Sequence, residues 1–248
     1  MKNLFGKYAE ENISEFSIRD IKYGRARLSV LRVFVDSIKD TNYEDIRIKD
    51  LCRTAEISEQ SFYNYFPKKD DLFLYFISLW SVDVQLHAYE LTPGVKRIYS
   101  LFEYTAKRSD QNPNLLRQVV AYRAKNETDD SSLKMKPVSL AEKCILFGNA
   151  DILKKLPDQG IAPVLNSNLK YAKKNGEISP DSDTNALTLG LAAIFFGIPI
   201  LTTNTGTSSL SENYRKAIQL MLHPYTKQTD LSKTSTRKRS EKKQTKGD

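Results

Sequence analysis

The stretch ISEQSFYNYFPKKDD, residues 57–71, places aromatic rings among small polar side chains and ends at a proline followed by two lysines. Ser58 is a good helix cap, because its hydroxyl accepts from the free backbone N–H groups of a first turn. Pro67 ends the helix, since proline lacks an N–H and disfavours helical geometry at the residue before it. The segment therefore predicts a helix of about two turns between Ser58 and Phe66.

The two faces of this helix differ in chemistry. At about 100° per residue, Phe62 and Phe66 lie on one face, whereas Gln60 and Asn64 lie on the opposite face. The rings are expected to pack against the protein, which leaves a narrow face of short hydrogen-bonding side chains free. Such a face suits the major groove of DNA, where the base edges present donors and acceptors.

Two helices are expected before this one. The first covers residues 21–39 and is followed by Asn42 in the left-handed C-terminal position. Its apolar residues recur at spacings of three and four: Leu28, Leu31, Val35 and Ile38. The second covers residues 48–54 and packs through Ile48, Leu51, Cys52 and Ala55. Three helices with tight turns make a helix-turn-helix arrangement.

The segment YEDIRIKDLCRTAEISEQSFYNYFPKKDDLF, residues 43–73, resembles the N-terminal domain of TetR/AcrR-type transcriptional repressors. The matching positions fall in one ungapped frame: Asp50, Leu51, Ala55, Ile57, Ser58, Phe62, Tyr63, Tyr65, Phe66, Lys69 and Leu72. The resemblance implies an all-α protein. In such a protein an N-terminal three-helix helix-turn-helix DNA-binding domain is followed by a larger helical regulatory and dimerisation domain.

Two positions depart from the pattern of the family. Glu56 stands where the family has a turn glycine, so this turn has to accept a Cβ atom with slight strain. Arg47 replaces the threonine that usually opens the second helix, so that cap is lost unless Asp45 substitutes for it. Arg47 is then available for a phosphate contact.

The resemblance also implies a set of DNA contacts. Tyr63, Tyr65 and Lys69 would hold phosphates, with packing as the alternative for Tyr65. Base edges would be approached by Lys49, Gln60 and Ser61, although Lys49 can also be a solvated charge. Glu59 can accept a hydrogen bond from a cytosine amino group, or its negative charge can interact favourably with the N-terminal end of the helix dipole. The predicted DNA-binding residues are Arg47, Lys49, Glu59, Gln60, Ser61, Tyr63, Asn64, Tyr65 and Lys69.

The rest of the chain is predicted to be a series of helices between proline, glycine and polar loops. They are expected over residues 70–89, 94–108, 114–126, 138–155, 162–175, 182–201 and 211–223. The expected domains are an N-terminal arm (1–20), the DNA-binding domain (21–69), a ligand-binding and dimerisation domain (70–225) and a basic disordered tail (226–248). This tail holds most of the formal net charge of +8. The tail is either a solvated segment or makes loose contact with the phosphate backbone.

The segment NALTLGLAAIFFGIPIL, residues 185–201, is apolar nearly all round. Its small residues allow close helix approach: Gly190, Ala192, Ala193 and Gly197. Such a helix needs cover on several sides, either at a subunit interface or as the central helix of a monomer. The resemblance implies a homodimer whose four-helix interface is formed by residues 182–201 and 211–223.

Aromatic side chains are frequent in the middle helices: Phe73, Phe76, Trp80, Tyr99, Phe102, Tyr122 and Phe147. The resemblance implies a cavity there for a small-molecule effector of unknown identity, and these rings suit an apolar or aromatic one. Cys52 and Cys144 fit neither a disulfide framework nor a metal site, which indicates a cytoplasmic protein. The longest apolar segment is broken by glycine and proline, so no membrane span is expected.

These observations predict a ligand-responsive transcriptional regulator, and specifically a repressor. It would bind a near-palindromic double-stranded operator as a dimer through the recognition helix Ser58 to Phe66. An enzyme is the first alternative, but the sequence shows no catalytic constellation, metal-ligand cluster or cofactor fingerprint. A single-strand binding module with stacking tyrosines is the second. We therefore expect neither catalysis nor a cofactor, and the sequence names no operator, gene or effector.

Overall fold

The computed structural model describes residues 13–125, 137–156, 160–202 and 209–225, and every regular element in these ranges is a helix. The all-α prediction is confirmed. The N-terminal part contains α1 (Ile18–Ser37), α2 (Ile48–Thr54) and α3 (Glu59–Tyr65). The longer helices that follow are α4 (Asp71–His87), α5 (Val95–Ser109), α6 (Pro113–Lys125), α9 (Ile161–Lys174), α10 (Thr184–Thr202) and α11 (Leu210–Leu222). Shorter elements are α7 (Leu140–Phe147), α8 (Ala150–Leu153), η1 (Ile13–Glu15), η2 (Tyr43–Asp45) and η3 (His223–Tyr225).

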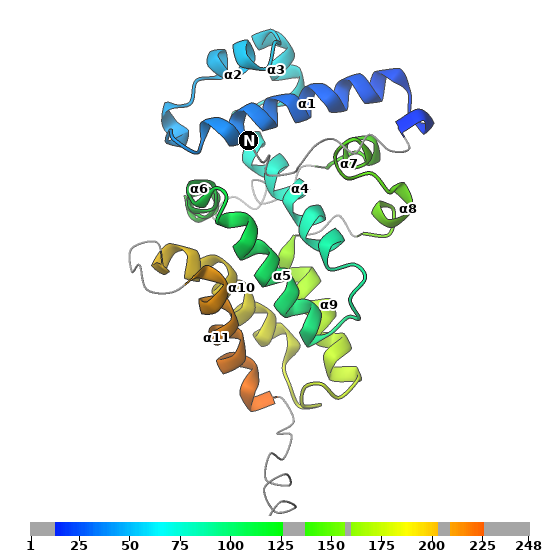
Figure 1. The fold of residues 1–248 in the computed structure, drawn as a ribbon, viewed down its shortest axis with the longest axis vertical. Helices are drawn as coiled ribbons and strands as arrows, with labels where there is room; N and C mark the ends of the chain where they lie inside the picture. Colours follow the sequence, from blue (N-terminus) through cyan, green and yellow to red (C-terminus); the bar gives the residue numbers. More distant parts are fainter. Residues whose placement is uncertain (1–12, 126–136, 157–159, 203–208, 226–248) are drawn as a thin grey trace, which may run out of the picture.

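The elongated molecule has a head of three helices at one end and a body of longer helices below it (Figure 1). We use "head" for α1, η2, α2 and α3 with the loops between them, and "body" for α4 to α11. Helix α4 starts beneath the head and runs into the body, where α5, α9, α10 and α11 form the far end (Figure 1). The position of the head is therefore set where it meets α4, α6 and α7.

Most predicted helices are present with ends shifted by a few residues, and two predictions are wrong. Asn42 has φ −66° and ψ 149°, an extended conformation that opens η2, because α1 already ends at Ser37. The helix expected over residues 138–155 is two helices. Gly148 (φ 69°) and Asn149 (φ 45°) turn the chain between α7 and α8, and the side chain of Asn149 caps α8 by accepting from the N–H of Ile152.

The far end of the body is held by packed aromatic rings. Phe102 of α5 meets Phe195 of α10 and Tyr214 of α11 edge to face, with centroids 5.2 and 5.0 Å away. The hydroxyl of Tyr214 donates to the backbone carbonyl of Phe195 at 2.7 Å. These contacts fix α10 and α11 as a pair against α5.

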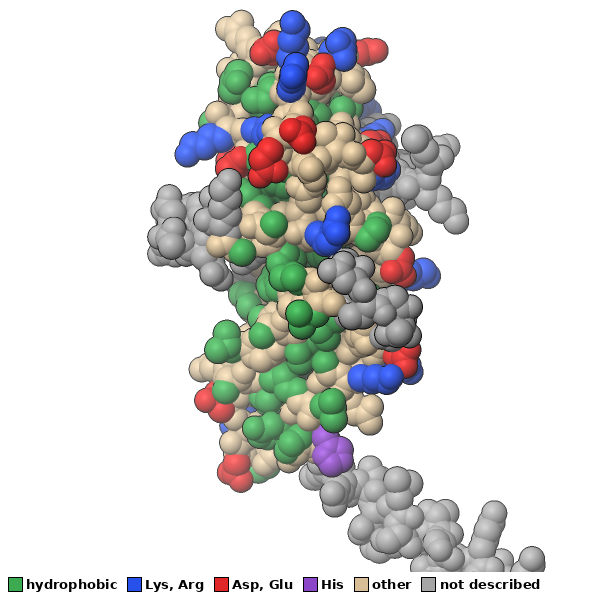
Figure 2. Space-filling model, turned by 90° about the vertical axis from the view of Figure 1, so that its left-hand side faces the viewer, with side chains coloured by type: hydrophobic (Ala, Val, Ile, Leu, Met, Phe, Trp, Pro, Cys, Tyr) green, Lys and Arg blue, Asp and Glu red, His purple; other side chains and the backbone are tan. Residues whose placement is uncertain are grey.

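Helix α10 exposes a strip of apolar side chains. Residues 184–201 are the one segment of the described ranges that is long and apolar enough, by length and composition, to cross a membrane. Leu187, Leu191 and Phe195 face the core, whereas Leu189 is 74% exposed. Further apolar residues on the exposed side are Ala186, Ala193, Ile200 and Leu201, with Leu220 of α11. Apolar side chains gather over the lower body in Figure 2.

A buried ion pair joins the head to the body. Arg27 of α1 donates to a carboxylate oxygen of Glu142 of α7 at 3.0 Å, and both side chains are almost fully buried. The same carboxylate accepts from the hydroxyl of Tyr75 of α4 and from Ser139, whose N–H it caps. Gly24 permits this approach of α1, since a Cβ atom there would lie 3.0 Å from the Cγ atom of Glu142.

We predict that Arg27→Met lowers the free energy of unfolding by about 3 kcal/mol, because it leaves the buried carboxylate of Glu142 without its cation. The measurement is the urea midpoint. The matched control is Arg53→Met, since Arg53 pairs with Asp50 at 2.9 Å but both side chains are exposed. That change should cost no more than about 1 kcal/mol. Equal losses for the two variants would contradict the role given to the Arg27–Glu142 pair.

Candidate nucleic-acid interface

Helix α3 has its predicted start and its predicted buried face. The hydroxyl of Ser58 accepts from the N–H of Ser61 at 3.0 Å, which caps the first turn. Phe62 and Phe66 are completely buried, with ring centroids 5.6 Å apart, and Phe66 packs against Tyr75 of α4 at 5.5 Å. Two aromatic rings therefore anchor α3 to the head and to the start of the body.

The opposite face of α3 is open to solvent. Gln60 and Asn64 are exposed, as is Glu59 in the first turn. Tyr63 is 49% exposed and rests edge-on against Phe62 at 5.5 Å. The predicted division of α3 into a buried aromatic face and an exposed polar face is thus present. Amides and hydroxyls along a short exposed helix can hydrogen-bond to base edges.

Two predicted contact residues are partly withdrawn from this face. Ser61 is half-buried, and its hydroxyl lies 2.9 Å from that of Ser58. Tyr65 is half-buried and meets the ring of Tyr23 of α1 edge-on, with centroids 5.1 Å apart. Tyr23 itself is exposed, which adds a phenol hydroxyl beside α3. Tyr23 was not among the predicted contact residues, although it lies one helical turn before Arg27, on the same side of α1.

Exposed cations lie before and after the α2–α3 pair in the chain. Arg47 is the residue that precedes α2, and its side chain makes no cap hydrogen bond, so the predicted loss of that cap is present. Lys49 in the first turn of α2 is exposed, and so is Lys68 after the end of α3. Exposed cations of this kind are the side chains that commonly bind phosphates.

Lys69 points to the interior of the head. Its ammonium group donates to the backbone carbonyls of Tyr43 and Ile46 at 2.7 and 3.0 Å and lies 4.1 Å from the centroid of the Tyr43 ring. Burial lowers the pKa of Lys69, and nearby carboxylates, first that of Asp70, oppose this shift. Lys69 thus ties the loop after α1 to the start of α4, and a phosphate would compete with these bonds.

The turn between α2 and α3 is strained at one residue. Glu56 has φ 57°, in the left-handed region. Two hydrogen bonds close the turn: the N–H of Ile57 donates to the carbonyl of Cys52 at 3.0 Å, and that of Glu56 to Arg53 at 3.3 Å. This is a Schellman ending, which usually has glycine at the left-handed position. The strain expected from the missing glycine is therefore present.

The body contains a separate apolar cavity of about 190 Å³. It is bounded by α4, α6, α9 and α10, with walls that include Trp80, Val84, Val119, Ile161, Phe195 and Phe196. Of the aromatic residues predicted to enclose a cavity, Trp80 lines this one. Phe73 and Tyr122 line a different cavity, near the head. Apolar walls with few polar groups suit a hydrophobic small molecule.

Comparison with known sequences identifies the N-terminal part. Residues 35–76 match the model of a family described as bacterial regulatory proteins, tetR family. The match runs from the end of α1 into α4 and includes the whole of α2 and α3. No curated protein matches the chain. The resemblance drawn from residues 43–73 is confirmed.

Solved structures share the fold over most of the chain. A TetR-family repressor of Thermus thermophilus, FadR in complex with lauroyl-CoA, aligns with a TM-score of 0.55 at 17% identity, over 79% of this chain and 93% of its own. A TetR-family regulator of Syntrophomonas wolfei aligns with a TM-score of 0.54 at 16% identity, over 79% of this chain and 92% of its own. The fatty acid degradation regulator FadR of Bacillus halodurans aligns with a TM-score of 0.53 at 14% identity, over 79% of this chain and 94% of its own. The fold is that of TetR-family regulators.

We predict that Glu56→Gly stabilises the protein by about 0.5–1 kcal/mol, because glycine adopts a positive φ without steric cost. The control is Glu59→Gly, which removes the same charge from a helical position and should destabilise by a similar amount. Chemical denaturation of the two variants beside the parent protein measures both effects. A loss of stability in Glu56→Gly would show that the turn is not strained.

Proposed function

We propose that this chain, which carries the N-terminal DNA-binding domain of the tetR family and the fold of its solved members, is a ligand-responsive transcriptional repressor. It acts in the cytoplasm as a homodimer on a near-palindromic double-stranded operator. The observation that carries the proposal is the exposed polar face of α3, held outward by the burial of Phe62 and Phe66.

The DNA contacts follow from how the side chains lie. Gln60 and Asn64 on the exposed face of α3 read base edges, together with Glu59 in its first turn. Arg47 and Lys49 at the start of α2 hold phosphates, as does the hydroxyl of Tyr63. Ser61 and Tyr65 are partly covered and make secondary contacts. Lys69 acts mainly by holding the loop after α1, because its ammonium group already binds two carbonyls.

The homodimer is supported by the exposed strip on α10 and α11. Leu189, Ile200 and Leu201 of α10 and Leu220 of α11 are all more than half exposed, which is unfavourable in an isolated subunit. Gly197 also favours an intersubunit role, since a Cβ atom there would meet nothing within 4 Å in the described part of the chain. Two copies packed through this strip bury a four-helix interface.

The effector binds in the apolar cavity beside Trp80. The FadR of Thermus thermophilus was solved with lauroyl-CoA, a ligand with a long apolar chain. For this protein we propose an apolar or aromatic effector, because the walls of the cavity have that character. Effector binding shifts the population toward dimers whose two recognition helices are no longer at the spacing that fits the operator.

Selection of bound sequences from a random duplex pool tests this function. We expect the recovered sites to be near-palindromic, with half-sites about one helical turn apart, because a two-fold dimer places two recognition helices in successive major grooves. Single-stranded DNA should compete poorly. Recovery of no common motif, or preference for single strands, would contradict a dimeric duplex reader.

Two variants separate base reading from phosphate binding at the selected site. Gln60→Ala should relax the preference at particular bases, at a cost of about 1–3 kcal/mol for the selected sequence only. Tyr63→Phe should weaken binding to all duplexes by a similar factor, because the hydroxyl that it removes meets the phosphate backbone, which is the same in every sequence. Electrophoretic mobility shifts with the selected and a scrambled duplex provide the measurement. Equal, sequence-blind losses for both variants would refute the division of roles.

The dimer interface is tested by Leu189→Arg, which places an unpaired charge in the proposed contact. We expect the dimer dissociation constant to rise by at least about 30-fold, because burying a charge without a partner costs at least about 2 kcal/mol. Ile18→Arg is the matched control, since Ile18 of α1 is 73% exposed and Leu189 is 74% exposed. Analytical ultracentrifugation should show unchanged association for the control. Unchanged association of Leu189→Arg would exclude this interface.

A further inference from the structure

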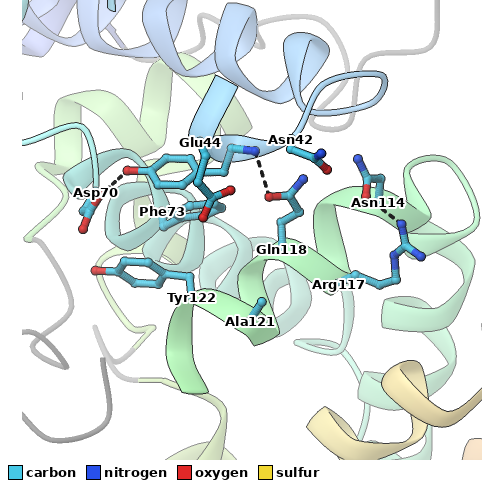
Figure 3. A pocket seen from close by; sticks show the side chains of 10 residues that line it. Asn42, Glu44, Asp70, Phe73, Asn114, Arg117, Gln118, Ala121 and Tyr122 are labelled. Carbon is cyan, nitrogen blue, oxygen red and sulfur yellow. Dashed lines mark hydrogen bonds between the residues drawn. The ribbon is translucent and has the colours of Figure 1, made fainter. Parts of the chain in front are cut away.

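A cavity of about 290 Å³ lies where the head meets the body. It is formed by the loop that enters η2, by the start of α4 and by one face of α6 (Figure 3). Its lining shares no residue with that of the apolar cavity beside Trp80. The proposed function leaves this second cavity without a role.

The head side of the cavity is fixed by hydrogen bonds. The backbone N–H of Tyr43 donates to the side-chain oxygen of Gln118 of α6 at 3.0 Å, and its phenol hydroxyl donates to the carboxylate of Asp70. Burial and then the contact with Asp70 raise the pKa of Tyr43, so its hydroxyl keeps its proton. Lys69 supports the same loop from behind. The walls are thus formed before any ligand arrives, which reduces the entropic cost of binding.

Groups of opposite charge lie at different places in the cavity. Asp70 and the hydroxyl of Tyr122 lie toward one end, Arg117 and Asn114 lie at the other, and Glu44 and Gln118 are between them (Figure 3). The guanidinium of Arg117 donates to the side-chain oxygen of Asn114 at 2.9 Å and is otherwise exposed. The lining therefore offers two carboxylates and one guanidinium, a pattern that suits a ligand with both a cationic and an anionic group.

Aromatic rings form the floor beside the carboxylates. Phe73 and Tyr122 are stacked with centroids 4.8 Å apart, and Tyr43 packs on Phe73 at 4.6 Å. Ring faces and carboxylates both attract an ammonium group. The volume lies at the lower limit of pockets for drug-sized ligands, which favours a molecule with few heavy atoms.

We propose that this junction cavity is a second ligand site and that it binds a small zwitterion of the amino-acid class. The ammonium group of the ligand lies near Glu44, the carboxylate between the two ends, and its own carboxylate pairs with Arg117, which is suited to hold carboxylates through two parallel bonds. Because the lining comes from the head and from the body, a bound amino acid restrains the head relative to α6. This site differs from that of the apolar effector in position and in chemistry.

Calorimetric titration of the full chain with L-lysine, L-glutamine, L-glutamate and L-phenylalanine tests the proposal. At least one of these amino acids should bind with a dissociation constant below about 1 mM. For that ligand, the amine lacking the carboxylate and the acid lacking the ammonium group should each bind at least about tenfold more weakly, a loss of about 1.4 kcal/mol. If none of the four gives saturable heat up to about 10 mM, the proposal is wrong.

Two variants locate the binding. Arg117→Gln and Glu44→Gln each change one exposed side chain. Each should raise the dissociation constant of the tightest-binding amino acid by at least about tenfold. Lys96→Gln, on the exposed surface of α5 away from this lining, is the charge-matched control and should bind normally. Normal binding by both cavity variants would overturn the assignment.

The single tryptophan distinguishes the two cavities. Trp80 lines the apolar cavity and does not line the junction cavity, so its emission should stay unchanged while the amino acid saturates. A saturable change in Trp80 emission that matches the calorimetric curve would place the amino acid in the apolar cavity and refute the junction site. Failure of duplex DNA binding by the chain would leave this result unaffected, because the titration uses no DNA.

Discussion

The guanidinium of Arg27 lies where α3, α4 and α7 meet, and the placement of the exposed polar face of α3 depends on this contact. Its centre is 4.1 Å from the centroid of the Tyr75 ring and 5.2 Å from that of Phe66, while it pairs with Glu142. Phe66 closes the buried side of α3. Because the cation is buried and its carboxylate partner is held by Ser139 and Tyr75, a displaced α7 would leave a charge unpaired. The head therefore cannot turn on the body without repacking this cluster.

Local signals explain how much of the fold could be predicted. Ser58 and Pro67 delimit α3 through a cap and a missing N–H, effects that act within one turn, so the helix and its two faces were predictable. The break at Gly148 and Asn149 was missed because an apolar pattern continued across both residues. The inward position of Lys69 and the burial of Arg27 could not be predicted from spacing, since both depend on partners more than twenty residues away. Charged residues are expected at the surface, and only tertiary contacts reverse that.

The two cavities lie along the same pair of helices. Helix α4 contributes Phe73 to the junction cavity and Trp80 to the apolar cavity, and α6 contributes Gln118 to the first and Val119 to the second. A shift of α4 or α6 that accommodates an effector in the apolar cavity would therefore alter the walls of the junction cavity, whereas an amino acid that fits the preformed junction cavity leaves the walls around Trp80 unchanged. Coupling of this kind is reciprocal, so each ligand changes the affinity for the other by the same factor.

The apolar cavity also touches the proposed subunit interface. Phe195 and Phe196 of α10 line it, while Leu189 and Ile200 of the same helix belong to the exposed strip. An occupant of this cavity would thus contact α10, which the proposed dimer would hold in place, and α4, whose preceding residues Asp70 and Lys69 bond to the loop after α1. If α10 is held by its partner, the strain of accommodating a ligand falls on α4 and moves the start of that helix. On the proposed function, the dimer is then needed for effector response as well as for operator symmetry.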